Sequence, residues 1–247
     1  MTDLQAVILA AVLCAVGGFL APMLVARIPE PPVKAQADLS DAERAEGPKE
    51  TYRSIAALPW FALTSLAVSG VAGGLVGYVE GASWLLVGLV PLVPLGVALA
   101  VVDLRTRLLP ARVVVPATVV MLVLGALGAA TIGDWSDLLR GVIGLAIGRS
   151  FYWVLWFVRS AGMGFGDVRL AALLGFTLAY VGWPEFLVGM YAGFLIFGLP
   201  GALLALVKRD AALLKVAFPF GPFMIAGALI GLCLGDPVVG YLVSRQS

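Results

Sequence analysis

Two aspartates at the edges of apolar runs are the side chains of this sequence best placed to do chemistry. Asp103 ends the run Leu99-Ala100-Val101-Val102, and Asp167 follows the turn Gly164-Phe165-Gly166 ahead of another apolar run. Ionisable residues at a membrane edge are energetically expensive, so they are functional candidates with a partner to be sought. Two carboxylates brought together can share one proton and perform acid–base chemistry on a peptide bond. We therefore treat Asp103 and Asp167 as the candidate catalytic pair.

The two glycines just before Asp167 suggest a functional role of their own. Gly164 and Gly166 let the backbone turn tightly and let another chain approach closely. They are therefore candidates for substrate binding. The motif is neither a phosphate-binding loop nor a dinucleotide fingerprint, because no Gly-Lys-Ser/Thr follows it and no strand precedes it.

The absence of histidine removes several kinds of site. The chain contains no histidine and two cysteines, Cys14 and Cys233, each inside an apolar run. Triads that use histidine, histidine-based zinc sites and four-cysteine zinc sites are therefore excluded. We predict no metal site.

Composition indicates the environment in which the two aspartates work. Of 247 residues, 61% are hydrophobic and 13% are charged, and the mean hydropathy is +1.03. Soluble domains are about 45–50% apolar and about 25% charged. The chain is therefore expected to be an all-α, polytopic bundle of membrane helices in contact with lipid. A net charge of +1 gives no reason to expect nucleic acid as a partner.

Runs of about 20 apolar residues predict about eight membrane spans. They lie near residues 4–27, 55–79, 83–102, 113–132, 138–158, 168–183, 185–207 and 219–243. This map divides the chain into an N-terminal transmembrane anchor (1–27), a cytoplasmic loop without zinc-binding cysteines (28–54) and a membrane-embedded core (55–247).

The distribution of basic residues predicts the orientation. The loops after the first, third, fifth and seventh spans carry 13 of the 16 Lys and Arg residues. Cytoplasmic loops carry the excess of positive charge. We therefore expect both termini outside, with Asp103 and Asp167 at the cytoplasmic face.

Each candidate residue could also have a purely structural role. Asp167 could simply cap a helix after a glycine-rich turn, and Asp103 could form an ion pair with Arg105 or Arg107 at the membrane edge. Arg149, inside an apolar run, could pair across the bundle or reach a water-filled cavity. The aromatic residues at 151–156 are more typical of lipid-facing or interfacial positions than of a ligand site.

Four sequence blocks resemble the prepilin peptidases, polytopic aspartic proteases of the GxGD type. The resemblance extends over most of the chain, and the blocks occur in the family's order. They are Phe19-Leu20 through Arg27-Ile28-Pro29, Val101-Val102-Asp103-Leu104-Arg105-Thr106-Arg107-Leu108-Leu109-Pro110, Gly162-Met163-Gly164-Phe165-Gly166-Asp167-Val168-Arg169-Leu170, and Phe218-Pro219-Phe220-Gly221-Pro222-Phe223.

The resemblance implies an enzyme of the bacterial plasma membrane with Asp103 and Asp167 as its catalytic residues. Its expected substrate is a type IV prepilin or a pseudopilin-like protein with a short basic leader and an apolar helix, cut at the cytoplasmic face. Peptide cleavage needs no cofactor, whereas many members also N-methylate the new N-terminus with S-adenosylmethionine. Two departures bear on methylation and on the block that carries Asp103: residues 28–54 contain no cysteine, and Ala111 follows Pro110 where the family usually has Asn or Asp.

Three alternatives remain at this stage. The main one is an ion- or proton-coupled transporter that uses Asp103 and Asp167 as ion sites, which predicts broken helices at the membrane midplane. An intramembrane protease of the presenilin kind would need Tyr-Asp and Pro-Ala-Leu motifs, and neither stands at the expected place. A non-catalytic scaffold gives no reason for two membrane-edge carboxylates.

Overall fold

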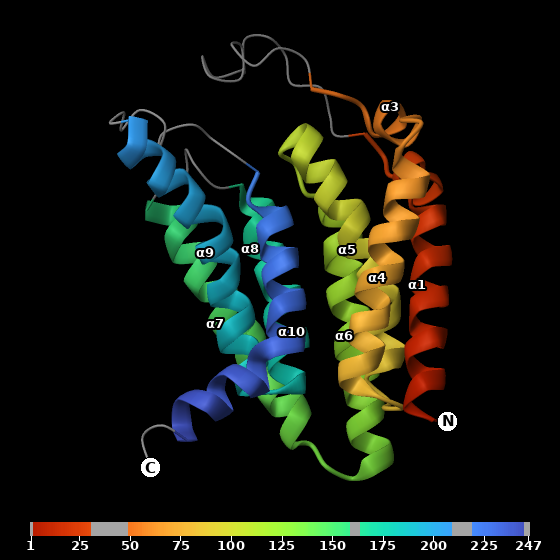
Figure 1. Cartoon of the computed structure of the whole chain (residues 1–247), viewed down its shortest axis with the longest axis vertical. Helices are drawn as coiled ribbons and strands as arrows, with labels where there is room; N and C mark the ends of the chain where they lie inside the picture. The colour runs from red at the N-terminus through yellow and green to blue at the C-terminus, as the bar shows by residue number, and fades with distance from the viewer. Residues whose placement is uncertain (1, 31–48, 159–163, 209–218, 245–247) are drawn as a thin grey trace.

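A computed structural model describes residues 2–30, 49–158, 164–208 and 219–244. For residues 199–208 it describes the helix but not the side chains. Every regular element in these ranges is a helix (Figure 1). The helices are α1 (Asp3–Ala26), α3 (Tyr52–Ala56), α4 (Phe61–Glu80), α5 (Leu86–Thr106), α6 (Ala111–Ile132), α7 (Ser136–Val158), α8 (Phe165–Val181), α9 (Trp183–Lys208) and α10 (Gly221–Ser244).

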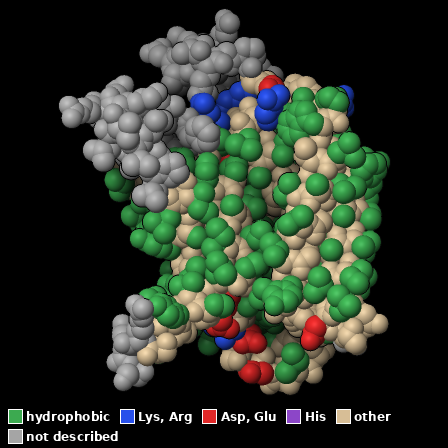
Figure 2. All heavy atoms as spheres, viewed as in Figure 1, with side chains coloured by type: hydrophobic (Ala, Val, Ile, Leu, Met, Phe, Trp, Pro, Cys, Tyr) green, Lys and Arg blue, Asp and Glu red, His purple; other side chains and the backbone are tan. Residues whose placement is uncertain are grey.

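The expected all-α polytopic bundle is confirmed. Eight of these helices lie at the positions of the eight expected spans, and the short helix α3 precedes the second. Six of them, α1, α4, α5, α6, α7 and α10, are long and apolar enough to cross a membrane. Helix α8 has 17 residues, and the part of α9 with described side chains, Trp183–Gly198, is a shorter apolar helix. On the face shown in Figure 2, apolar side chains cover the middle of the bundle and charged ones gather at its two ends.

Small residues let the helices pack closely. Helix α1 lies against α4, where a Cβ on Gly73 would come within 2.5 Å of the Sγ atom of Cys14. Helix α7 lies against α8 in the same way, because a Cβ on Gly175 would lie 2.6 Å from the carbonyl oxygen of Gly144. Lipid is as apolar as the side chains, so such close backbone packing supplies much of the association energy in a membrane.

Helices α5, α8 and α10 carry the candidate site to one end of the bundle. Helix α5 ends there, and α8 and α10 begin there (Figure 1). Helix α1 begins at the opposite end, and α10 finishes there after a bend in its last turns, where Pro237 interrupts the hydrogen-bond ladder (Figure 1). The predicted division at residues 27 and 54, and the predicted side of each end, stay predictions.

At that opposite end, one side chain joins α7 to α8. The Nε atom of Arg140 donates to the carbonyl of Ala179 at 2.6 Å, and its Nη2 atom donates to those of Tyr180 and Val181 at 2.6 and 2.8 Å. These are carbonyls of the last turn of α8, which have no partner within the helix. A cation is favoured there by the helix dipole. Arg140 therefore closes α8 and fixes it beside α7.

Candidate active site

Asp103 lies in the last turn of α5 and is 3% exposed. Its Oδ2 atom accepts a hydrogen bond of 3.0 Å from the backbone N–H of Gly221, the first residue of α10. The negative end of the α5 dipole disfavours a carboxylate by about 0.3–1 kcal/mol. A hydrogen bond to a charged group contributes about 1.5–3 kcal/mol. The contact with the start of α10 therefore outweighs the unfavourable end of α5.

Asp167 is the third residue of α8 and is 6% exposed. Its Oδ2 atom accepts a 3.2 Å hydrogen bond from the N–H of Gly164, and its own N–H donates to the carbonyl of Gly164. Asp167 thus helps to cap its helix, as the structural interpretation of the sequence predicts. A buried position at the positive end of a helix also suits a functional carboxylate.

The fold brings these two carboxylates together. Asp103 and Asp167 interact electrostatically although they lie 64 positions apart in the sequence. The contact of Asp103 with Gly221 adds a third segment, 118 positions further along the chain. One end of the bundle therefore holds two buried carboxylates, each fixed by the backbone N–H of a glycine.

Leu109 fills the space between the three helix ends. A Cβ on Gly166 would lie 2.8 Å from the Cβ of Leu109, and a Cβ on Gly221 would lie 3.3 Å from its Cδ1. Each glycine therefore lets α8 or α10 close on the same leucine, which is 8% exposed. Leu109 sets how near the beginnings of α8 and α10 come to the end of α5.

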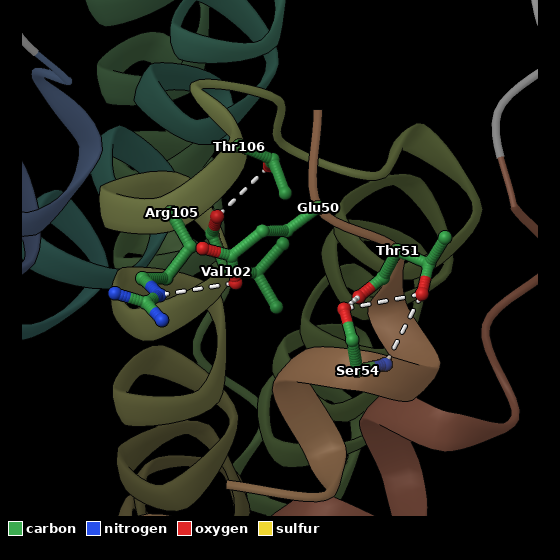
Figure 3. Close-up of polar contacts among 6 residues, drawn as sticks. All are labelled: Glu50, Thr51, Ser54, Val102, Arg105 and Thr106. Atoms are coloured by element: carbon green, nitrogen blue, oxygen red, sulfur yellow. Dashed lines mark hydrogen bonds and ion pairs between the residues drawn. The ribbon is translucent and has the colours of Figure 1, made fainter. Parts of the chain in front are cut away.

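A polar turn holds Leu109 in place. The Oγ1 atom of Thr106 donates to the carbonyl of Val102 at 2.8 Å (Figure 3) and accepts from the N–H of Leu108 at 3.1 Å. Arg107 then takes a left-handed conformation with φ of 54°. This conformation ends α5 at Thr106. Leu109 follows two residues later and lies, like Asp103, beside Gly221.

Arg105 pairs with Glu50 rather than with Asp103. The Nε atom of Arg105 lies 3.2 Å from Oε2 of Glu50 (Figure 3), and both side chains are about 40% exposed. Next to Glu50, Lys49 acts electrostatically on Asp103. The segment that leads into α3 therefore borders the site, which the sequence did not indicate.

Among the aromatic residues at 151–156, which were expected to face lipid or the interface, Tyr152 is instead buried beside the site. Tyr152 is 1% exposed and interacts electrostatically with Asp167, whereas its neighbours Phe151 and Trp153 are exposed. Its ring stacks on Phe194 at 5.3 Å between centroids and lies 5.9 Å from Phe220. Because Phe220 precedes the glycine that binds Asp103, Tyr152 supports both halves of the site.

The other candidates are placed as follows. The N–H of Gly164 is engaged by Asp167, and Gly166 lies against Leu109, so their role in substrate binding stays a prediction. The side chain of Arg149 is exposed on α7. Asp103 and Asp167 lie at helix ends, not at the midplane breaks that a transporter predicts. Within the described residues, no group of three or more His, Cys, Asp or Glu side chains could hold a metal ion.

Comparison with known proteins places this chain in a family. Residues 90–240, more than half of the chain and both aspartates, match the model of the type IV leader peptidase family. The chain resembles proteins named prepilin leader peptidase/N-methyltransferase from several bacteria. That of Pseudomonas putida is 31% identical over 163 residues, 64% of this chain and 53% of the relative.

Other relatives of the same name match with similar identity and coverage. The protein of that name from Stutzerimonas stutzeri is 30% identical over 174 residues, 68% of this chain and 57% of the relative. That from Bacillus subtilis is 29% identical over 148 residues, which cover 60% of this chain and 55% of the relative. This chain thus spans about half the length of the curated relatives that it matches, and no solved structure matches it. On the family match, the chain belongs to the type IV leader peptidase family.

Proposed function

We propose that this chain is a membrane aspartic endopeptidase whose catalytic residues are Asp103 and Asp167. The observation that carries the proposal is the meeting of the two buried, interacting carboxylates at one end of the bundle, within the segment that matches the family. Two carboxylates that interact strongly titrate as a pair, so one can be ionised while the other holds a proton.

The pair can hydrolyse a peptide bond without another group. The ionised carboxylate takes a proton from water, and the resulting oxygen nucleophile attacks the carbonyl carbon. The protonated carboxyl group gives its proton to the carbonyl oxygen. The tetrahedral intermediate then collapses: one of its hydroxyl groups returns a proton to the ionised carboxylate as the carbonyl re-forms, the carbon–nitrogen bond breaks, and the leaving nitrogen takes a proton from the other carboxyl group. Both carboxylates finish with one shared proton, as they began.

The backbone contacts prepare the two side chains for these roles. One oxygen of each carboxylate accepts from a glycine N–H. This fixes the orientation of the carboxyl group and leaves its second oxygen for water or substrate. Groups held in reacting geometry before the substrate arrives contribute strongly to the rate.

The substrate that this site suits is a type IV prepilin or a pseudopilin-like protein, cut at the cytoplasmic face of the bacterial plasma membrane. The printed name of the relatives supports the substrate class. Lys and Arg side chains gather at the end of the bundle where α5 ends, while Asp and Glu gather at the other end (Figure 2). This asymmetry supports a cytoplasmic site and external termini.

The experiment that tests the proposal follows cleavage of a prepilin by the purified chain in detergent, with the mass of the products as the readout. Asp103→Asn and Asp167→Asn keep the size of each side chain and remove its acid. We expect both to abolish cleavage while the protein stays folded. Full activity of either variant would contradict the assignment.

Methyl transfer is a separate activity that the same spectra measure. The relatives' name includes N-methyltransferase. Adding S-adenosylmethionine to the assay supplies the methyl donor, and transfer raises the mass of the mature product by about 14 Da, the increment that replacing one hydrogen by a methyl group gives. The two aspartate variants should abolish cleavage in its presence as well as in its absence.

A further inference from the structure

An apolar cavity of about 430 Å³ lies between α4, α5, α8 and α10. Its lining is mostly aliphatic and includes Val97, Leu173 and Leu229. Helices α5 and α10 face each other across this part of the bundle (Figure 1). Exposed residues such as Val68 and Ala226 also line it, so the cavity is a groove open to the surroundings of the bundle.

The groove leads to the two aspartates. At one end it is lined by Val101 and Pro222, which lie within two residues of Asp103 and of its hydrogen-bond donor Gly221. Along α5 the lining continues back to Leu89. At 1.5 Å per residue this gives a groove about 18 Å long, more than half of the thickness of the hydrocarbon core.

We propose that this groove binds the apolar helix of the substrate, so that the peptide bond just before that helix lies at Asp103 and Asp167. The inference rests on the proposed function and adds where the substrate is held. The occupant must be apolar to suit the lining, and a peptide segment in that setting must be helical so that its backbone groups are paired.

The small residues of the lining favour a helix over a lipid chain. Small residues from three of the four helices, Ala72, Gly96, Ala100 and Ala226, lie along the groove. Small side chains allow the close approach of another helix backbone.

The test compares two substrates and two tryptophan variants. One substrate is a full-length prepilin, and the other is a soluble peptide that spans the cleavage site but lacks the apolar helix. Ala226→Trp fills the groove, while Ala67→Trp places the same side chain at an exposed position of α4 outside the lining. Misplacing a substrate by about 1 Å can reduce the rate about 100-fold. We expect Ala226→Trp to lower kcat/KM for the full-length substrate at least about tenfold.

Cleavage of the short peptide should stay within about twofold of wild type in both variants, since the chemistry of the pair is untouched. Equal losses on both substrates would contradict the groove, and so would an unchanged rate on the full-length substrate, the result expected if a lipid chain fills it. A wild type that cleaves neither substrate would instead remove the proposed function itself.

Cross-linking tests the same contact without relying on activity or on the folding of the tryptophan variant. A photoreactive amino acid at position 97, on the groove face of α5, should capture the apolar helix of a full-length prepilin. The same probe at position 67 is the control. Capture at position 97 that is no stronger than at position 67 would overturn the proposal.

Discussion

Replacing Gly221 by alanine tests how the backbone holds the first catalytic candidate. A Cβ at this position would lie 2.7 Å from Oδ2 of Asp103 and 3.3 Å from Cδ1 of Leu109. Real side chains do not tolerate the shorter of these distances, so the carboxylate or the first turn of α10 has to move. The 3.0 Å hydrogen bond from the N–H of residue 221 to Asp103 is then lost or distorted.

The strength of that hydrogen bond sets the expected effect. A hydrogen bond to a charged group contributes roughly 1.5–3 kcal/mol. Because each 1.36 kcal/mol or so corresponds to tenfold in rate, a contact that is needed in the transition state gives a loss of roughly 10- to 150-fold. We therefore expect Gly221→Ala to reduce kcat by about this factor, with a smaller change in KM.

The assay is the initial rate of prepilin cleavage, and the same helix supplies the control. At Gly240, also in α10, an added Cβ meets nothing within 4 Å. Alanine is favoured over glycine inside a helix by roughly 0.5–1 kcal/mol, so Gly240→Ala should keep wild-type activity and be at least as stable as wild type. If a folded Gly221→Ala variant cleaves at the wild-type rate, the N–H of residue 221 does not position Asp103 and the reasoning is wrong.

Further substitutions test the packing of the bundle, beside the site at Gly166, Leu109 and Tyr152 and at the opposite end at Arg140. Gly166→Ala should lower cleavage because its Cβ meets Leu109 at 2.8 Å, and adding Leu109→Ala should recover part of the loss, with a coupling of about 0.5–3 kcal/mol in a double-mutant cycle. Tyr152→Ala should destabilise the fold by roughly 3–5 kcal/mol, the range for a buried aromatic, whereas Tyr152→Phe keeps the stacked ring and should unfold near the wild-type temperature. Arg140→Ala removes three hydrogen bonds to the end of α8 and should lower the unfolding temperature by an amount equivalent to about 2–3 kcal/mol. An unchanged unfolding temperature for Arg140→Ala would show that water replaces these contacts.

The sequence predicts the two aspartates because their signal is local. A carboxylate at the end of an apolar run is conspicuous in any membrane protein, and Asp103 and Asp167 both stand at such ends. The partner of Asp103 is not local, because Gly221 lies 118 residues away and uses a backbone N–H that every residue except proline possesses. Its position could be anticipated only from the resemblance of the block at 218–223.

The aromatic residues of α7 show a second limit of the sequence. Tyr152 is buried while Phe151 and Trp153 on either side are exposed. A helix that is apolar all round carries no contrast between a polar and an apolar face, so the sequence does not tell which side meets lipid and which meets protein. Only the packing of α7 against its neighbours decides it.

The ion pair of Arg105 shows a third limit of what the sequence can predict. Arg105 stands two residues after Asp103, so proximity in the sequence favoured a pair between them, but the structure pairs Arg105 with Glu50. Residues two apart on a helix point in different directions and do not face each other. Helix geometry already argued against the local pair, although it could not supply Glu50.

A double-mutant cycle on the two aspartates tests most directly whether they act as one catalytic pair. The rates of prepilin cleavage are measured for wild type, Asp103→Asn, Asp167→Asn and the variant with both substitutions. Groups that act as a unit are strongly non-additive, so we expect the double variant to be no slower than either single variant. Losses that multiply in the double variant, or substantial cleavage by either single variant, would contradict a shared mechanism.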